Sequence, residues 1–130
     1  MLAADTNVVV RLIAADDAAQ HRKARALFAA ESIWLSQTVL LETEWVLRGV
    51  YRYPRHHVIA ALRAIVGLPG VILESPAITS RALDWHEAGM DFADALHLAA
   101  ADHCEAFVTF DHALATAAGR PEIGRPVREP

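Results

Sequence analysis

The fold of this 130-residue chain is decided by its first stretch, Met1-Leu2-Ala3-Ala4-Asp5-Thr6-Asn7. Four apolar residues are followed by a carboxylate, a hydroxyl and an amide, and a helical pattern begins immediately afterwards. Short apolar runs of this kind are typical of strands that are buried in a parallel sheet. We therefore expect Leu2–Asp5 to be a buried strand that places Asp5 at an edge of the sheet, with the N-terminus inside the fold.

The size and composition of the chain limit the class of protein. Its length corresponds to one domain, so residues 1–130 are expected to fold as a single unit. No apolar run is long enough to span a bilayer, no export leader is present, and Cys104 is the only cysteine, which indicates a cytoplasmic protein without disulfides or membrane contact. A formal charge of −4 argues against nucleic-acid binding by bulk charge, although a local basic face could hold a few phosphates.

Apolar strands alternate with amphipathic helices along the rest of the chain. Further strands are expected at residues 33–36, 71–73, 106–110 and around 127. Helices are expected at residues 7–14, 18–30, 38–49, 55–66, 76–87, 91–104 and 111–118, with Thr38 as the N-cap of the third. This alternation predicts an α/β fold with a mainly parallel sheet of four to five short strands, covered by helices on both faces.

Four acids lie where such a sheet would gather them. Asp5 and Asp111 follow apolar strands, and Glu42 and Asp94 lie early in helices. Open parallel sheets bind ligands beyond the carboxyl ends of their strands, and the same end of a helix favours a carboxylate. Glu42 is expected beside the buried stripe of its helix, where a charge without a partner is costly, whereas Glu44 is expected to face solvent.

Each of these acids also has a purely structural interpretation. Asp5 and Asp111 could equally cap the helices that follow them, and Asp91 is better explained as an N-cap than as a chemical group. Asp94 could be a favourable acid in a first helical turn. His97 lies one turn after Asp94, but a partly buried histidine bonded to the backbone explains it better than a role in the site.

Taken together, these segments resemble the PIN-domain nucleases. The resemblance rests on four segments in order, Asp5-Thr6-Asn7, Leu40–Arg48, Asp91–Leu96 and Val108–Asp111, and the chain has the length of the VapC-type toxins of that family. It implies a three-layer α/β/α sandwich and a Mg²⁺- or Mn²⁺-dependent endoribonuclease. It also implies an antitoxin protein as partner and a homodimer, with RNA as the substrate.

The resemblance implies that the catalytic and metal-binding residues are Asp5, Glu42, Asp94 and Asp111. Hard divalent cations prefer oxygen ligands and relieve the repulsion within a cluster of carboxylates. We expect Asp5 and Asp94 to be the core ligands, Glu42 to bind the metal or orient water, and Asp111 to act through water. The expected supporting residues are Thr6, Asn7 and Thr109, and the expected RNA contacts are Arg11, Arg48 and Arg52, although the basic stretch around Arg52 could simply be a solvated helix end.

Two other classes of protein fit parts of the sequence. In one, Asp5 is the nucleophile of a phosphohydrolase. Haloacid-dehalogenase phosphatases resemble this start, but they have a second aspartate two residues on, where this chain has Asn7. In the other, the chain keeps a PIN fold and binds RNA or protein without catalysis, which the presence of all four acids argues against.

Overall fold

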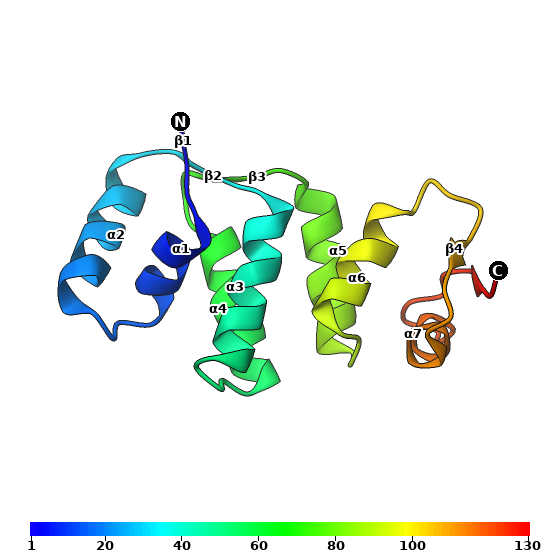
Figure 1. Cartoon of the computed structure of the whole chain (residues 1–130). Coiled ribbons are helices and arrows are strands. Elements are labelled where there is room, and N and C mark those ends of the chain that lie inside the picture. The colour runs from blue at the N-terminus through cyan, green and yellow to red at the C-terminus, as the bar shows by residue number, and fades with distance from the viewer. The chain divides into compact units, whose positions relative to one another are not determined.

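The computed structural model describes residues 1–130 and contains seven helices and five short strands. Its Cα positions group into two compact units, Met1–Ser75 and Pro76–Pro130. Figure 1 follows the chain through the elements of the first unit, in blue to green, and then through those of the second, in green to red. Strands and helices alternate in the order that the sequence predicts, and all strand pairs are parallel.

A three-stranded parallel sheet forms the first unit's framework. β1 (Leu2–Ala3), β2 (Ile33–Leu35) and β3 (Val71–Leu73) lie in the order β1-β2-β3. The central strand β2 is the best covered, since Ile33 and Leu35 are fully buried. The predictions that the first strand is buried and that the N-terminus lies inside the fold are wrong. Met1 is 76% exposed and Leu2 is 47% exposed, because β1 lies at the edge of this sheet with β2 as its neighbour.

Four helices pack with this sheet. They are α1 (Thr6–Ile13), α2 (Ala18–Ala30), α3 (Gln37–Gly49) and α4 (Arg55–Val66). Within the unit, α1 packs against α2 and α3, and α3 packs against α4, as Figure 1 shows. The shared core contains Ala4, Val9, Phe28, Ile33, Leu35, Leu40 and Ile65.

The start of α3 differs from the sequence prediction by two residues. Ser36, not Thr38, is the N-cap, and its hydroxyl accepts a hydrogen bond of 3.1 Å from the backbone N–H of Val39. Thr38 already lies inside the helix, and its hydroxyl is 3.0 Å from that of Ser36. Serine is the better N-cap residue of the two, so the residue type itself favours Ser36 over Thr38.

The second unit combines three helices and a strand pair. α5 (Pro76–Glu87) packs against α6 (Phe92–Ala100). β4 (Phe107–Val108) pairs in parallel with β5 (Val127–Arg128), and α7 (His112–Ala118), which lies between these strands in the chain, packs against β5. Helix α6 ends at Ala100 instead of reaching Cys104 as predicted. Asp102 and His103 form helices less readily than the alanines before them, and Asp102 pairs instead with Arg81 of α5 at 3.0 Å. None of the seven helices has the length and apolar character needed to cross a membrane.

Candidate functional site

Two of the predicted acids line one cavity in the first unit. The cavity has a volume of about 370 Å³, and both Asp5 and Glu42 contribute to its wall. Its other lining residues are Thr6, Asn7, Val10, Arg11, Val46, Val50 and Tyr51. Asp5 is the N-cap of α1, just after β1, and Glu42 lies in the middle of α3, so the packing of α1 against α3 brings residues 37 positions apart to one hollow. We call this hollow the acidic cavity.

Asp5 caps α1 and also lines the cavity. Its Oδ1 accepts a hydrogen bond of 2.8 Å from the backbone N–H of Thr6, so the capping interpretation is confirmed. The second oxygen, Oδ2, has no protein partner. Capping and ligand binding are therefore compatible at Asp5, because a carboxylate has two oxygens that accept independently.

Thr6 connects the two acids. Its side chain is buried, and its hydroxyl donates a hydrogen bond of 3.0 Å to Oε2 of Glu42. The backbone of the same residue holds Asp5, so one threonine fixes a carboxylate on each side of it. Asn7 lines the same cavity but makes no hydrogen bond through its side chain.

Glu42 and Glu44 have the opposite burial from that predicted. Glu42 is exposed to solvent at the cavity, whereas Glu44 is only 1% exposed. Arg48, one turn further along α3, donates through Nε to Oε1 of Glu44 at 2.8 Å. A buried carboxylate needs such a cationic partner, so Glu44 belongs to the packing of α3 and not to the cavity.

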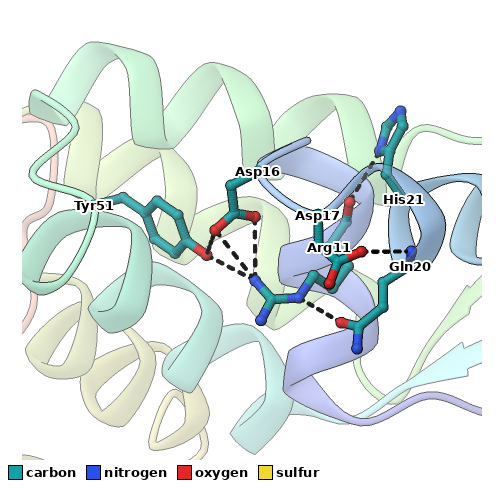
Figure 2. A network of polar contacts seen from close by, with 6 residues as sticks. All are labelled: Arg11, Asp16, Asp17, Gln20, His21 and Tyr51. Carbon is teal, nitrogen blue, oxygen red and sulfur yellow. Dashed lines mark hydrogen bonds and ion pairs between the residues drawn. The ribbon is translucent and has the colours of Figure 1, made fainter.

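Arg11 lies on the cavity wall within a network that the sequence did not reveal. Its Nη1 donates to Oδ1 of Asp16 at 3.1 Å and to the hydroxyl of Tyr51 at 2.9 Å, and that hydroxyl donates to Oδ2 of Asp16 at 2.8 Å. Figure 2 shows these three groups closing a triangle, with Gln20 on the other side of the guanidinium. Tyr51 lies 40 residues from Arg11, and no spacing rule connects such positions.

The network also shifts the ionisation of its members. The hydrogen bond from Tyr51 is the main reason that the pKa of Asp16 lies below its usual value, with the charge of Arg11 acting in the same direction. The hydrogen bond to Asp16 is the main reason that the pKa of Tyr51 lies above its usual value, with partial burial and the negative charge of Asp16 acting in the same direction. At neutral pH the triangle is therefore a cation, a neutral phenol and a carboxylate.

The second unit contains the other two predicted acids. Asp94 lies in the first turn of α6, and its side chain is partly buried. Burial is the main cause that raises the pKa of the Asp94 carboxyl, followed by the negative charges of Asp91 and Asp111. The positive form of His97 lowers it in part. Asp94 has no lysine or arginine partner, so its charge is unbalanced within this unit.

Asp91 and Asp111 are helix caps, as their structural interpretations predict. Asp91 accepts a hydrogen bond of 3.2 Å from the backbone N–H of Asp94, and Asp111 accepts one of 3.1 Å from that of Leu114. The hydroxyl of Thr109 accepts from the backbone N–H of Asp111 at 3.0 Å. Thr109 therefore supports the turn that carries Asp111, and its part in the candidate site stays a prediction.

His97 is not the buried histidine that the sequence predicts. It is exposed on α6. The buried histidine bonded to the backbone is His86 of α5, whose Nδ1 lies 2.7 Å from the carbonyl oxygen of Met90. Neither unit by itself gathers three His, Cys, Asp or Glu side chains close enough to bind one metal ion.

The three predicted RNA contacts have different surroundings. Arg11 is held in the network at the acidic cavity, and Arg48 is paired with Glu44. Arg52 is exposed and has a positive φ of 59°, a conformation that residues other than glycine rarely adopt. Next to it, the ring of Tyr53 stacks on His57 with centroids 4.3 Å apart, which agrees with a packing role for that tyrosine.

Residues 3–120 match the PIN domain family. This match covers most of the chain and spans both units, so the chain belongs to the PIN-domain family, and the predicted PIN-type α/β fold is confirmed. Among solved structures, the crystal structure of VapC20 from Mycobacterium tuberculosis, a sarcin–ricin-loop-cleaving toxin, is similar at 25% identity, covering 97% of this chain and 100% of that chain with a TM-score of 0.44. No curated protein sequence matches the chain.

Proposed function

We propose that this protein is a divalent-metal-dependent endoribonuclease and the toxin of a toxin–antitoxin pair. Membership of the PIN-domain family supports the hydrolysis of RNA phosphodiester bonds. The observation that carries the proposal is the acidic cavity, where Asp5 and Glu42 share one wall and Thr6 bonds to both.

The residues present suit Mg²⁺ or Mn²⁺. All the candidate ligands are carboxylate, hydroxyl or amide oxygens, which hard divalent cations prefer. We propose Asp5 and Asp94 as the main ligands, with Glu42 and Asp111 as further ligands or as groups that hold metal-bound water. Asp94 supports this assignment, because its partly buried charge has two acidic neighbours and no cationic partner.

Side chains of the cavity would orient the attacking water and bind the phosphate. A bound divalent cation supplies an activated water and offsets charge on the phosphate. Thr6 holds the carboxylate of Glu42 in one orientation, so that Glu42 can accept a hydrogen bond from the attacking water. Arg11 provides a fixed positive charge on the same cavity wall for a phosphate oxygen.

The proposed partners are an antitoxin protein and a second copy of the chain. In the first unit, Trp45 of α3 is a candidate for such contacts, because its large aromatic side chain is 57% exposed. Aromatic side chains are enriched at the buried centres of protein interfaces. Trp85, in contrast, is buried in the second unit and serves its core.

The decisive experiment is cleavage of RNA by the purified protein. We expect Mg²⁺ or Mn²⁺ to be required, EDTA to abolish cleavage, and Asp5→Ala and Asp94→Ala to reduce it at least a hundredfold while the variants stay folded by circular dichroism. The proposal is wrong if the wild type binds no divalent cation and both variants behave like it. A phosphoryl group trapped on Asp5 would instead identify a phosphohydrolase, and RNA binding without turnover would identify a non-catalytic module.

A further inference from the structure

A second cavity adjoins the acidic one and has the opposite chemistry. Its volume is about 280 Å³, and it lies between α1 and α2. Its lining residues are Asn7, Val8, Arg11, Gln20, Lys23 and Ala24. Asn7 and Arg11 line both cavities, so these two residues form the wall between them. We call the second hollow the basic cavity.

Each polar side chain that lines the basic cavity can donate hydrogen bonds. Lys23 is exposed and has no acidic partner, and Nη2 of Arg11 makes no hydrogen bond within the protein. Nε of Arg11 donates to Oε1 of Gln20 at 2.6 Å, which occupies the amide oxygen and leaves the amide NH₂ group available. No carboxylate lines this cavity. A wall of two cations and two amides is suited to an anion.

The donors are held in place before any ligand arrives. Asp16 and Tyr51 fix one edge of the Arg11 guanidinium and Gln20 fixes another, as Figure 2 shows. The ring of His21 adds a further tie, because its Nδ1 lies 2.9 Å from the carbonyl oxygen of Arg11 and donates to it. A guanidinium that is already oriented loses less conformational entropy when it binds a phosphate.

Helix α2 extends this positive character beyond the cavity. Between Asp17, which caps it, and Glu31, which follows it, the helix has no acidic residue, whereas it contains Arg22, Lys23 and Arg25. All three cations are exposed and unpaired. In a chain with a formal charge of −4, this is a local concentration of positive charge beside the candidate site.

We propose that the basic cavity binds the phosphodiester group next to the one that is cleaved. This inference rests on the proposed ribonuclease function, because it places one phosphate of a strand at the acidic cavity and its neighbour at the basic one. Arg11 lies between them and can contact either phosphate, Lys23 neutralises the flanking phosphate, and Asn7 and Gln20 donate to its oxygens. A continuous RNA strand, rather than a free phosphate, is the ligand that fits two adjoining cavities of opposite charge.

A protection experiment tests the position of the strand. Lys23 is the only lysine in the chain, so an amine-acetylating reagent modifies one side chain besides the N-terminus. In EDTA, where cleavage is absent, we expect a saturating single-stranded oligoribonucleotide to slow acetylation of Lys23 several-fold. Unchanged acetylation at saturation, or no binding of the oligonucleotide at all, overturns the proposal. Equal protection by inorganic phosphate at the same phosphate concentration assigns the cavity to free phosphate and also overturns it.

A salt titration with matched variants tests the contact itself. Lys23→Gln removes a charge from the cavity wall, and Arg22→Gln removes one from the next position of α2, outside the cavity. For single strands, each phosphate contact contributes about −0.7 to the slope of log K against log salt. We expect Lys23→Gln to reduce the magnitude of the slope by about 0.7, Arg22→Gln to change it much less, and Lys23→Arg to restore it. Equal effects of Lys23→Gln and Arg22→Gln on the slope would indicate attraction by diffuse charge and would overturn the proposed phosphate site.

These measurements separate the failure of this inference from that of the proposed function. Suppose that the wild type cleaves RNA with Mg²⁺, but RNA does not protect Lys23 and Lys23→Gln changes the salt slope no more than Arg22→Gln does. The ribonuclease function then stands and the phosphate site is wrong. Suppose instead that RNA protects Lys23 from acetylation and Lys23→Gln changes the salt slope more than Arg22→Gln does, but neither Mg²⁺ nor Mn²⁺ supports cleavage. The contact between Lys23 and the strand then stands and the ribonuclease function is wrong.

Discussion

The hydroxyl of Thr6 in α1 donates a hydrogen bond of 3.0 Å to Oε2 of Glu42 in α3. The two residues are 36 positions apart, and the bond joins two helices at the wall of the acidic cavity. Glu42 is exposed, so without this bond its long side chain would be free to choose among several rotamers. Thr6 therefore sets the direction in which the Glu42 carboxylate faces.

Removing the Thr6 hydroxyl should reduce catalysis. Thr6→Val keeps the shape of the buried side chain but loses the bond to Glu42. Because hydrogen bonds to charged groups contribute roughly 1.5–3 kcal/mol, we expect kcat/KM for RNA cleavage to fall by about tenfold to a hundredfold. Thr6→Ser, which retains the hydroxyl, should stay within a few-fold of wild type. Full activity of Thr6→Val would show that Glu42 needs no such support.

The same substitution at two positions of α3 should separate catalysis from packing. Glu42→Gln is expected to reduce cleavage at least a hundredfold and to change the free energy of unfolding by less than about 0.5 kcal/mol, because the side chain is exposed. Glu44→Gln is expected to lower stability by roughly 1–3 kcal/mol, because it weakens a charge-assisted bond to Arg48 at a buried position, and to leave cleavage within a few-fold. Urea unfolding and a cleavage assay on both variants decide this. The reverse pattern would place Glu44, not Glu42, in the site.

The order and limits of the elements follow closely from the apolar pattern. The predicted bounds of α2, α4 and α5 agree with the structure, because each helix has a clear cap, proline or glycine at its limits. The short strands were also predictable, including the last one near Val127. Local sequence determines these features, since they depend on residues within a few positions of one another.

The burial of the two glutamates of α3 could not be predicted from the local sequence. Apolar side chains surround both positions, from Val39 to Leu41 and from Trp45 to Leu47, so α3 has no single polar face. Burial was decided by the helices that pack on α3, namely α1 and α4, which the sequence does not specify. The contact between Tyr51 and Asp16 was equally inaccessible, because it joins two turns 35 residues apart. The shared metal site of the four acids stays a prediction that the variants above test.

Removing the charge of Asp94 should stabilise the metal-free protein. Its pKa is raised, mainly by burial, so the folded state holds the proton more tightly than the unfolded state does. Protonated Asp94 therefore contributes stability to the folded state. This contribution is complete below the usual pKa of an aspartate and is lost as the pH rises through the raised pKa of Asp94. We expect Asp94→Asn to unfold at a higher temperature than wild type in EDTA at pH 7, and the difference to vanish near pH 3.

A matched control and a metal titration complete this test. Glu122→Gln removes an exposed acid from the same unit and should leave the unfolding temperature unchanged. Addition of Mg²⁺ should raise the unfolding temperature of wild type more than that of Asp94→Asn, because a ligand that binds the folded state stabilises it. Equal responses of the two proteins to Mg²⁺ would exclude Asp94 from the metal site.

The triangle of Arg11, Asp16 and Tyr51 should be visible in the titration of one tyrosine. The chain has two tyrosines, so in Tyr53→Phe the phenolate absorbance reports Tyr51 alone. Oδ2 of Asp16 accepts a hydrogen bond of 2.8 Å from the Tyr51 hydroxyl, and its charge would repel the phenolate, so the pKa of Tyr51 lies above its ordinary value. The stability that this bond contributes is present at neutral pH and is lost as the pH rises through the raised pKa.

In the Tyr53→Phe background, we expect Asp16→Asn to lower the pKa of Tyr51 towards the ordinary range. Asp17→Asn, which removes only the cap of α2, should leave it in place. If Tyr51 titrates in the ordinary range in the Tyr53→Phe protein, the triangle does not hold Arg11 at the wall between the two cavities, and the pre-organisation of that guanidinium fails with it.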